Sequence, residues 1–236
     1  MSSEARVKAV REAVRTVRGL KPEVLGLGSG STMRLFIEAL SSEAPDLKRR
    51  LMVVPTSHDA ALKAEELGFR VLDPLTAPDP DVTVDSADEV DPELNLLKGG
   101  GGALTLEKVI ASRSPRYVIV VEDAKLVDRL CERHPLPLEV LPAAWRYVTS
   151  RVGGVLPGCR VALRKSKAKV GPVVTDLGNF LLDVGVDSGI EPGDVEGVEA
   201  SLKLITGVVE VGLFPRRMVS QVIVGFKDGV KVLEPG

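Results

Sequence analysis

The chain has 236 residues, of which 44% are hydrophobic and 27% are charged, and its formal net charge is -2 at pH 7. These values are ordinary for a globular protein of one or two domains, and the slight negative charge argues against a nucleic-acid-binding surface. The sequence has no apolar run near the ~20 residues that a membrane-spanning helix needs, and it has no charged and then apolar leader. A cytoplasmic protein is therefore expected.

The first half of the chain alternates apolar strand-like runs with amphipathic stretches. Near the N-terminus, Val7, Val10, Val14 and Val17 recur at helical spacing. The predicted helices span 5–17, 32–40, 57–67 and 103–112, and the predicted strands span 24–27, 51–54, 82–84 and 117–121. Strands that alternate with helices are typical of a parallel sheet with helices on its faces. The pattern therefore predicts an α/β fold with a Rossmann-like, mostly parallel sheet.

The alternation ends near His134, where prolines at 135, 137 and 142 follow. Beyond this point the sequence predicts strands at 161–164 and 179–184, a basic loop at 165–169 and a helix near 194–203. These elements indicate a smaller inserted α+β domain of ferredoxin-like type. We predict that it spans 133–207 and lies at the subunit interface, and that 1–132 and 208–236 form the main domain.

The last segment contains Asp228-Gly229 between β-rich runs at 219–226 and 230–233. An Asp-Gly pair between two such runs favours a tight hairpin turn. The two cysteines, Cys131 and Cys159, lie far apart without metal-ligand spacing, so free thiols are expected.

A glycine-rich turn, Gly26-Leu27-Gly28-Ser29-Gly30-Ser31-Thr32, joins a predicted strand to a predicted helix. Its amides and hydroxyls would face an anion at the positive end of the helix dipole, as in a phosphate-binding turn. The turn lacks the third glycine of a dinucleotide fingerprint, since Met33 stands there, and it lacks the lysine of a P-loop. Glycine-rich turns also occur for packing alone, but the hydroxyls favour ligand binding.

Three acids, Asp85, Asp88 and Glu89, follow the predicted strand at 82–84. They could form a metal site, a solvated loop or a set of acid and base groups. A lysine and a polyglycine loop follow closely, and these suit a neutral sugar and an oxyanion better than a cation.

Lys98, four consecutive glycines at 99–102 and Glu107 come next. Bare glycine backbone is conformationally costly, so four glycines favour close approach to a ligand oxygen. Glu107 falls in the first turns of a predicted helix, where it could simply complement the helix dipole. Beside loop amides that stabilise an oxyanion, it could instead act as a general base, with Lys98 neutralising an enediolate.

Six ordered motifs together make the chain resemble the type A ribose-5-phosphate isomerases over nearly its whole length. These motifs are Gly28–Thr32, Pro55–Ser57, Asp85–Glu89, Lys98–Lys108, Pro135–Val140 and Thr175–Asn179. The resemblance implies a metal-independent and cofactor-independent, reversible conversion of D-ribose 5-phosphate to D-ribulose 5-phosphate in the non-oxidative pentose phosphate pathway. It also suggests a homodimer or homotetramer that binds a phosphosugar and neither nucleic acid nor membrane.

The same resemblance implies roles for particular residues. Glu107 falls on the base, and Asp85, Asp88 and Lys98 fall on positions for ring opening and stabilisation of the intermediate. The implied substrate-binding residues are Ser29, Gly30, Ser31, Thr32, Ser86, Ala87, Gly99, Gly100, Gly101, Lys125 and Lys8. Ser29, Ser86 and Ala124 stand where the family has threonine, glycine and serine, and these differences bear on substrate affinity more than on reaction type.

Two other functions have to be weighed. One is a non-catalytic, phosphosugar-sensing domain of the kind found in sugar-responsive repressors, although only one helix precedes Gly26 and the retained Glu107 favours catalysis. The other is a coenzyme A transferase-like enzyme with a glutamate nucleophile, which the short chain and the ordered motifs disfavour. His58 as the base is a weaker alternative, since the sequence marks no partner for it. Lys165, Lys167 and Lys169 are interpreted as a solvated strand face or a subunit contact.

Overall fold

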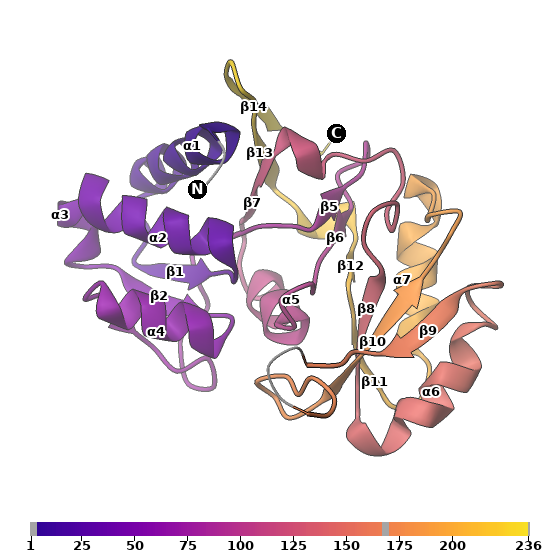
Figure 1. Ribbon diagram of the computed structural model, residues 1–236. Coiled ribbons are helices and arrows are strands. Elements are labelled where there is room, and N and C mark those ends of the chain that lie inside the picture. Colours follow the sequence, from indigo (N-terminus) through magenta and orange to yellow (C-terminus); the bar gives the residue numbers. More distant parts are fainter. Residues whose placement is uncertain (1–3, 167–169, 236) are drawn as a thin grey trace. The chain divides into compact units, whose positions relative to one another are not determined.

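The structure is a computed structural model that describes residues 4–166 and 170–235, so Lys167 and Lys169 of the predicted basic loop lie outside it. The chain forms two compact units (Figure 1). Unit 1 comprises Met1–Ala87, Leu106–Lys125 and Arg217–Gly236, and unit 2 comprises Asp88–Thr105 and Leu126–Arg216. These bounds differ from the predicted domain ranges chiefly because 88–105 group with unit 2, and the division into domains stays a prediction.

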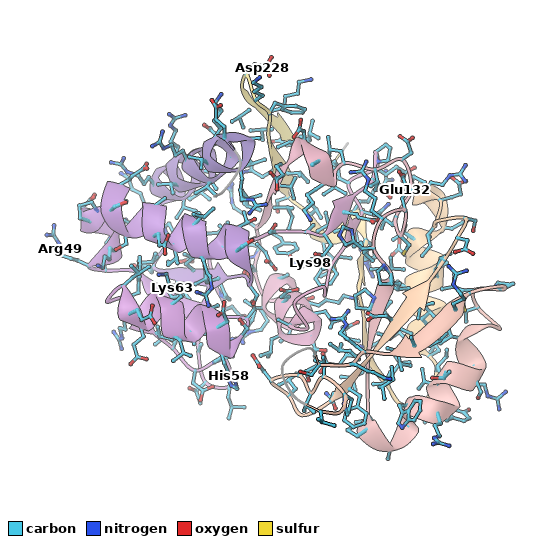
Figure 2. All side chains as sticks on the ribbon, in the orientation of Figure 1. Arg49, His58, Lys63, Lys98, Glu132 and Asp228 are labelled. Carbon is cyan, nitrogen blue, oxygen red and sulfur yellow. The ribbon has the colours of Figure 1, made fainter. Side chains whose placement is uncertain are left out.

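Unit 1 is built on a seven-stranded sheet in the order β14-β13-β7-β4-β1-β2-β3. Its strands are β1 (Val24–Leu27), β2 (Met52–Pro55), β3 (Arg70–Val71), β4 (Val82–Asp85), β7 (Tyr117–Glu122), β13 (Gln221–Gly225) and β14 (Val230–Leu233). Every neighbouring pair is parallel except β13 and β14, which form the antiparallel hairpin that Asp228-Gly229 predicted (Figure 2 labels Asp228). The predicted Rossmann-like sheet is confirmed.

Helices cover both faces of this sheet, so its central strands are apolar on both sides. The helices are α1 (Glu4–Leu20), α2 (Ser31–Glu43), the short α3 (Pro45–Lys48), α4 (His58–Glu66) and α5 (Leu104–Ser112). Leu25 and Val53 belong to the core cluster that includes residues of α1, α2 and α4. The alternate positions Val24 and Val54 pack instead with Ile110 of α5.

Unit 2 contains an antiparallel sheet in the order β11-β8-β10-β9. Its elements are β8 (Leu136–Val140), α6 (Trp145–Val152), β9 (Arg160–Leu163), β10 (Phe180–Gly185), α7 (Val195–Lys203) and β11 (Val208–Val211). A smaller sheet joins β5 (Glu89–Val90), β6 (Leu96–Leu97) and β12 (Leu213–Phe214). The chain order βαββαβ of the larger sheet confirms the predicted ferredoxin-like type.

Strand β8 corrects the interpretation of 135–142 as a break, because β8 is a central strand that contains Pro137. Proline has no N–H to donate to a neighbouring strand. The pairing with β11 begins only at Leu138, and the carbonyl of Pro137 accepts a hydrogen bond from the amide of Gly212 at 2.8 Å. Pro137 therefore stands at the end of this ladder, where its missing donor is tolerated.

Both cysteine thiols are free, as predicted. Burial raises the pKa of the Cys131 thiol, with a further contribution from the nearby Glu89 carboxylate, and burial also raises the pKa of Cys159. No helix of the described chain is long and apolar enough to cross a membrane.

The two thiols are expected to react at different rates with a thiol reagent, because the thiolate is the nucleophile and Cys131 is the more deeply buried. Ellman's reagent should modify Cys159 at least about tenfold faster than Cys131 in the native protein. Single Cys159→Ser and Cys131→Ser variants would assign the two phases. Equal rates at both cysteines would contradict this expectation.

Candidate active site

The predicted site residues divide between the two units. The chain leaves unit 1 after Ala87 and returns to it at Leu106, so both crossings fall inside the motifs that the sequence singled out. Unit 1 holds the glycine-rich turn, Asp85, Glu107, Lys125 and Lys8. Unit 2 holds Asp88, Lys98 and the glycine loop, Gly99–Gly102.

The glycine-rich turn connects β1 to the N-terminus of α2, as predicted. The Gly28 amide donates to the carbonyl of Val84 at 2.9 Å, and a Cβ at Gly28 would lie 2.0 Å from Oδ1 of Asp85. Gly28 is thus required because a carboxylate occupies the space of a side chain. Gly30 precedes α2 with φ of 92°, which glycine adopts without strain, and no side chain caps this helix. The α2 N-terminus therefore presents amides and a positive dipole end.

A hydroxyl network fixes this turn to the loop that follows β2. The Ser29 hydroxyl donates to Oγ of Ser57 at 2.7 Å and lies 2.9 Å from Oγ1 of Thr56. Ser57 in turn caps α4, accepting from the amide of Ala60 at 3.1 Å, at the start of the helix predicted over 57–67. The Pro55-Thr56-Ser57 motif therefore orders the turn. His58 lies exposed at the first position of α4 (Figure 2).

Asp85 ends β4 and is completely buried. Its Oδ2 accepts a hydrogen bond from the Tyr117 hydroxyl at 3.1 Å, and its Oδ1 accepts from the amide of Ser86 at 2.7 Å. Burial, followed by the charges of Asp85 and Glu107, raises the pKa of Tyr117 well above its ordinary value. Tyr117 therefore stays protonated and donates to Asp85. Ser86 is accommodated because its backbone does not adopt positive φ.

Glu107 lies in the first turn of α5 with its side chain buried, and only 5% of the residue is exposed. Its charge contributes to raising the pKa of Tyr117, the phenol that donates a hydrogen bond to Asp85, so both carboxylates act electrostatically on the same side chain. A buried carboxylate near a second carboxylate is an arrangement that suits proton transfer.

Lys125 lies just after β7, and Lys8 and Arg6 lie in the first two turns of α1. Lys125 is half-buried in the short 3-10 helix Asp123–Lys125. Lys8 contacts the Lys227 carbonyl and lies 3.0 Å from Glu4. Arg6, which no motif in the sequence marks, pairs with Glu122 and donates to the Ser31 hydroxyl at 3.5 Å. The pattern of α1 could show only that Arg6 and Lys8 lie on different sides of the helix.

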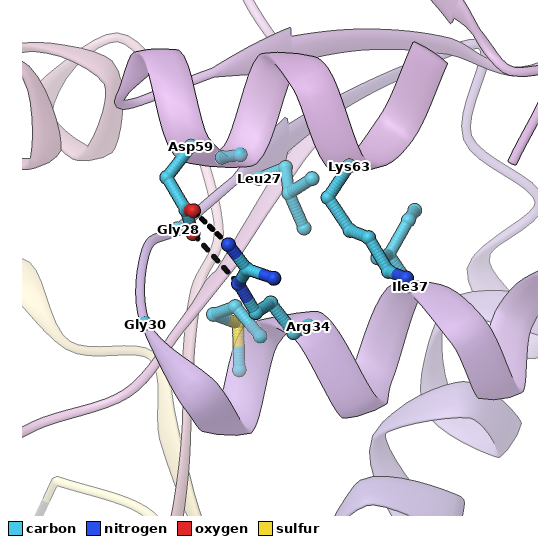
Figure 3. Close-up of a pocket in the computed structure, with 9 residues that line it drawn as sticks. Leu27, Gly28, Gly30, Arg34, Ile37, Asp59 and Lys63 are labelled. Atoms are coloured by element: carbon cyan, nitrogen blue, oxygen red, sulfur yellow. Dashed lines mark hydrogen bonds and ion pairs between the residues drawn. The ribbon is translucent and has the colours of Figure 1, made fainter. Parts of the chain in front are cut away.

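A shallow depression beside the glycine-rich turn is lined by residues of α2 and α4 (Figure 3). Arg34 of α2 pairs with Asp59 of α4, with Nε 3.0 Å from Oδ2, and Lys63 pairs with Glu38 at 2.6 Å. These ion pairs balance the positive charges of Arg34 and Lys63. The depression therefore does not offer an unpaired positive charge to an anion, and the ion pairs connect α2 to α4.

In unit 2, Asp88 organises the start of the glycine loop. Its amide donates to the carbonyl of Leu97 at 2.8 Å, and its Oδ2 accepts from the Gly100 amide at 2.8 Å. A Cβ at Gly100 would lie 2.9 Å from Oδ1 of Asp88, so this glycine permits the contact. Lys98, labelled in Figure 2, directly follows β6 and is 3% exposed. Its Nζ lies 5.5 Å from the centre of the Phe214 ring.

Glu89 has a structural role in unit 2. It is fully buried, and its carboxylate accepts hydrogen bonds from the amides of Cys131 at 2.6 Å and of Arg133 and His134 at 2.7 Å each. Glu89 is therefore a buried residue that fixes the backbone of 131–134, and not a solvated loop residue. In the described part of the chain, no three His, Cys, Asp or Glu side chains converge in a way that could hold a metal ion.

Glu139, within the Pro135–Val140 motif, anchors the other end of the glycine loop. It is 1% exposed and accepts hydrogen bonds from the hydroxyls of Thr105 at 2.6 Å and Thr175 at 2.8 Å. A third bond comes from the side-chain amide of Asn179 at 2.9 Å. The Thr175–Asn179 motif therefore supports Glu139, and Asn179 has a structural role.

Comparison with known proteins gives a consistent family. The model of ribose 5-phosphate isomerase A (phosphoriboisomerase A) matches residues 52–229. A ribose-5-phosphate isomerase A of Archaeoglobus fulgidus is 40% identical over 235 residues, covering 99% of this chain and 100% of the relative. Among solved structures, the ribose 5-phosphate isomerase A of Methanocaldococcus jannaschii is 35% identical with a TM-score of 0.88, covering 98% of each chain. A D-ribose-5-phosphate isomerase in complex with phospho-erythronic acid is 38% identical with a TM-score of 0.89, covering 99% of this chain and 100% of that one.

Proposed function

The chain belongs to the ribose 5-phosphate isomerase A family and isomerises ribose 5-phosphate, and we propose that Glu107 is the base of this reaction. The observation that carries the assignment is a buried glutamate in the first turn of α5, at the position that the family motif predicts. Burial withholds solvent from the carboxylate and keeps it in a single orientation for proton transfer. We further propose that the product is D-ribulose 5-phosphate and that the reaction serves the pentose phosphate pathway.

The reaction begins with opening of the sugar ring, for which we propose Asp85. A carboxylate that relays a proton between the ring oxygen and the anomeric hydroxyl must be held in place. The hydrogen bonds from Tyr117 and from the Ser86 amide support this role for Asp85. Because Tyr117 remains protonated, it donates to Asp85 without competing for the proton that Asp85 relays.

Glu107 then takes the proton from C2 and returns it to C1, and the enediolate forms between these steps. The ammonium of Lys98 and the amides of the glycine loop stabilise the negative charge that develops on the oxygens. Asp88 orients a substrate hydroxyl and shuttles the proton between the two oxygens. The bond from the Gly100 amide supports this role, because it fixes Asp88 to the same loop.

The phosphate supplies binding energy away from the reacting carbons. The proposed ligands are the turn Ser29–Thr32 at the N-terminus of α2, Lys125 and Lys8, while Ser86, Ala87 and Gly99–Gly101 contact the sugar. The α2 N-terminus has no side-chain cap, and this supports the phosphate assignment. Ser29 has the supporting contact to Ser57 described above, so it contributes by shaping the turn as well.

The family membership disfavours both alternative functions, since the relatives are named as isomerases. The chain's assembly into a homodimer or homotetramer, the place of the smaller domain in the subunit interface and a cytoplasmic location stay predictions.

The first experiment is conversion of D-ribose 5-phosphate by the purified protein in the presence of EDTA. We expect full turnover to D-ribulose 5-phosphate, because carboxylates and Lys98 supply the acid, base and charge stabilisation without a metal. Phospho-erythronic acid, which binds the similar protein named above, should inhibit competitively. Saturable binding of the phosphosugar without turnover would instead favour a sensing domain, and turnover lost in EDTA would contradict the metal-independent mechanism.

A further inference from the structure

The glycine loop of unit 2 is held by an arginine that the motifs did not include. Nη1 of Arg164 donates hydrogen bonds to two successive carbonyls of the loop, those of Gly99 at 3.0 Å and Gly100 at 3.1 Å. Arg164 lies 65 residues from Gly99 in the sequence, directly after β9. One guanidinium therefore fixes two adjacent peptide groups of the loop.

These contacts determine where the loop amides point. In a trans peptide, the carbonyl and the following N–H point in opposite directions, and no described peptide bond is cis. The Gly99–Gly100 peptide is held at both ends, by Arg164 on its carbonyl and by Asp88 on its N–H. The carbonyl of Gly100 also faces Arg164, so the N–H of Gly101 points away from Arg164, and Gly101 is exposed.

Arg164 is itself held by Asp183. Its Nε lies 3.0 Å from each carboxylate oxygen of Asp183, and its Nη2 contacts Oδ1. The Arg164 amide donates to the carbonyl of Leu181 in β10, which makes Arg164 and Asp183 diagonal neighbours on one face of the sheet. Their side chains are only 17% and 25% exposed. A guanidinium clamped by a carboxylate in this way has one orientation, which lysine could not reproduce.

A charged donor also changes the peptides that it contacts. A carbonyl that accepts from a cation is polarised, and this polarisation strengthens the N–H of the same peptide as a donor. The peptide between Gly100 and Gly101 receives such a bond, so the Gly101 amide becomes a stronger donor toward an oxyanion.

We propose that Arg164 and Asp183 are positioning residues for the isomerisation. They fix the peptide planes of the glycine loop so that the Gly101 amide is presented to the oxygen that becomes negative in the enediolate. The inference rests on the proposed function, in which the loop amides stabilise this intermediate. Neither residue touches the substrate, and both act through the loop.

The chain offers a matched control at the other end of β9. Arg160 of β9 pairs with Asp187, with Nη1 2.6 Å from Oδ2, and these side chains are 72% and 68% exposed. This pair resembles Arg164 and Asp183 in chemistry and in strand position, but its hydrogen bonds do not reach the glycine loop. Arg160→Ala therefore reports what loss of an arginine–aspartate pair does to the sheet alone.

The test compares kcat, KM and the thermal midpoint of Arg164→Ala, Arg164→Lys, Asp183→Asn and Arg160→Ala. We expect Arg164→Ala to lower kcat by about 10- to 100-fold with KM within about threefold of wild type. The reason is that a misplaced Gly101 amide would weaken stabilisation of the enediolate more than binding of the substrate. Its thermal midpoint should fall by no more than about 4 °C. Arg164→Lys and Asp183→Asn should show the same split in smaller degree, and Arg160→Ala should match wild type in kcat.

Added methylguanidinium should restore part of the kcat of Arg164→Ala and leave that of Arg160→Ala unchanged. If Arg164→Ala fails to fold, Arg164→Lys provides the same kcat and KM comparison. A kcat near wild type in a folded Arg164 variant, or an equal loss in Arg160→Ala, would overturn the inference while leaving the isomerase function intact. Absence of turnover by the wild-type protein would overturn the proposed function and this inference together.

Discussion

Replacing Glu107 by Gln is expected to lower kcat by about 10³-fold or more, with KM within about threefold of the wild-type value. Glutamine has nearly the same shape as glutamate, so the buried position in the first turn of α5 remains filled. Its amide cannot accept a proton from carbon, however, so the loss falls on the chemical step. Steady-state kinetics with D-ribose 5-phosphate would measure this difference.

Two controls make the Glu107 result specific. Glu65→Gln changes an exposed glutamate of α4 in the same unit and should leave kcat unchanged within about twofold. The wild-type protein should also exchange the transferred hydrogen with deuterium from the solvent, since an enediolate forms, and Glu107→Gln should lose this exchange together with turnover. A Glu107→Gln variant with a kcat within tenfold of wild type would assign the base to another residue.

The parts of the fold that could be predicted are those in which the information is local. The helix of α1, the Ser57 cap and the Asp228-Gly229 hairpin each depend on residues within a few positions of one another. The same holds for Glu107, whose place in the first turn of α5 follows from the glycine run just before it.

The parts that could not be predicted depend on contacts between distant segments. Pro137 argues against a central strand, yet Leu136–Val140 is one, because β10 and β11 supply the pairing. Glu89 accepts from amides 42 to 45 residues away, and Arg164 holds carbonyls 64 and 65 residues away. No spacing rule in the sequence marks these pairs. From the sequence alone, Glu89 at the end of the Asp85–Glu89 motif could therefore be either a structural residue or an acid–base group.

Replacing Glu89 by Ala should therefore destabilise the protein strongly, by about 3–5 kcal/mol. The carboxylate is fully buried, and its loss leaves three amides, of Cys131, Arg133 and His134, without their acceptor. Cys131 also has a φ of 68°, an unfavourable conformation that the bonds to Glu89 hold in place. Urea unfolding followed by circular dichroism would measure the change.

The matched control for this substitution is Glu132→Ala, which removes an exposed glutamate from the same segment and should cost less than about 0.5 kcal/mol. The loss of stability in Glu89→Gln should lie between the two, because glutamine keeps one acceptor oxygen but turns an NH₂ group toward backbone donors.

Comparing the free energy of unfolding with kcat in the Glu89 variants decides whether Glu89 is structural or catalytic. At temperatures where Glu89→Ala is folded, its kcat should stay within about tenfold of wild type, because Glu89 holds 131–134 in place and does not take part in proton transfer. A loss of kcat as large as that of Glu107→Gln in a folded Glu89→Gln variant would show instead that Glu89 takes part in catalysis, as proposed for Asp85 and Asp88.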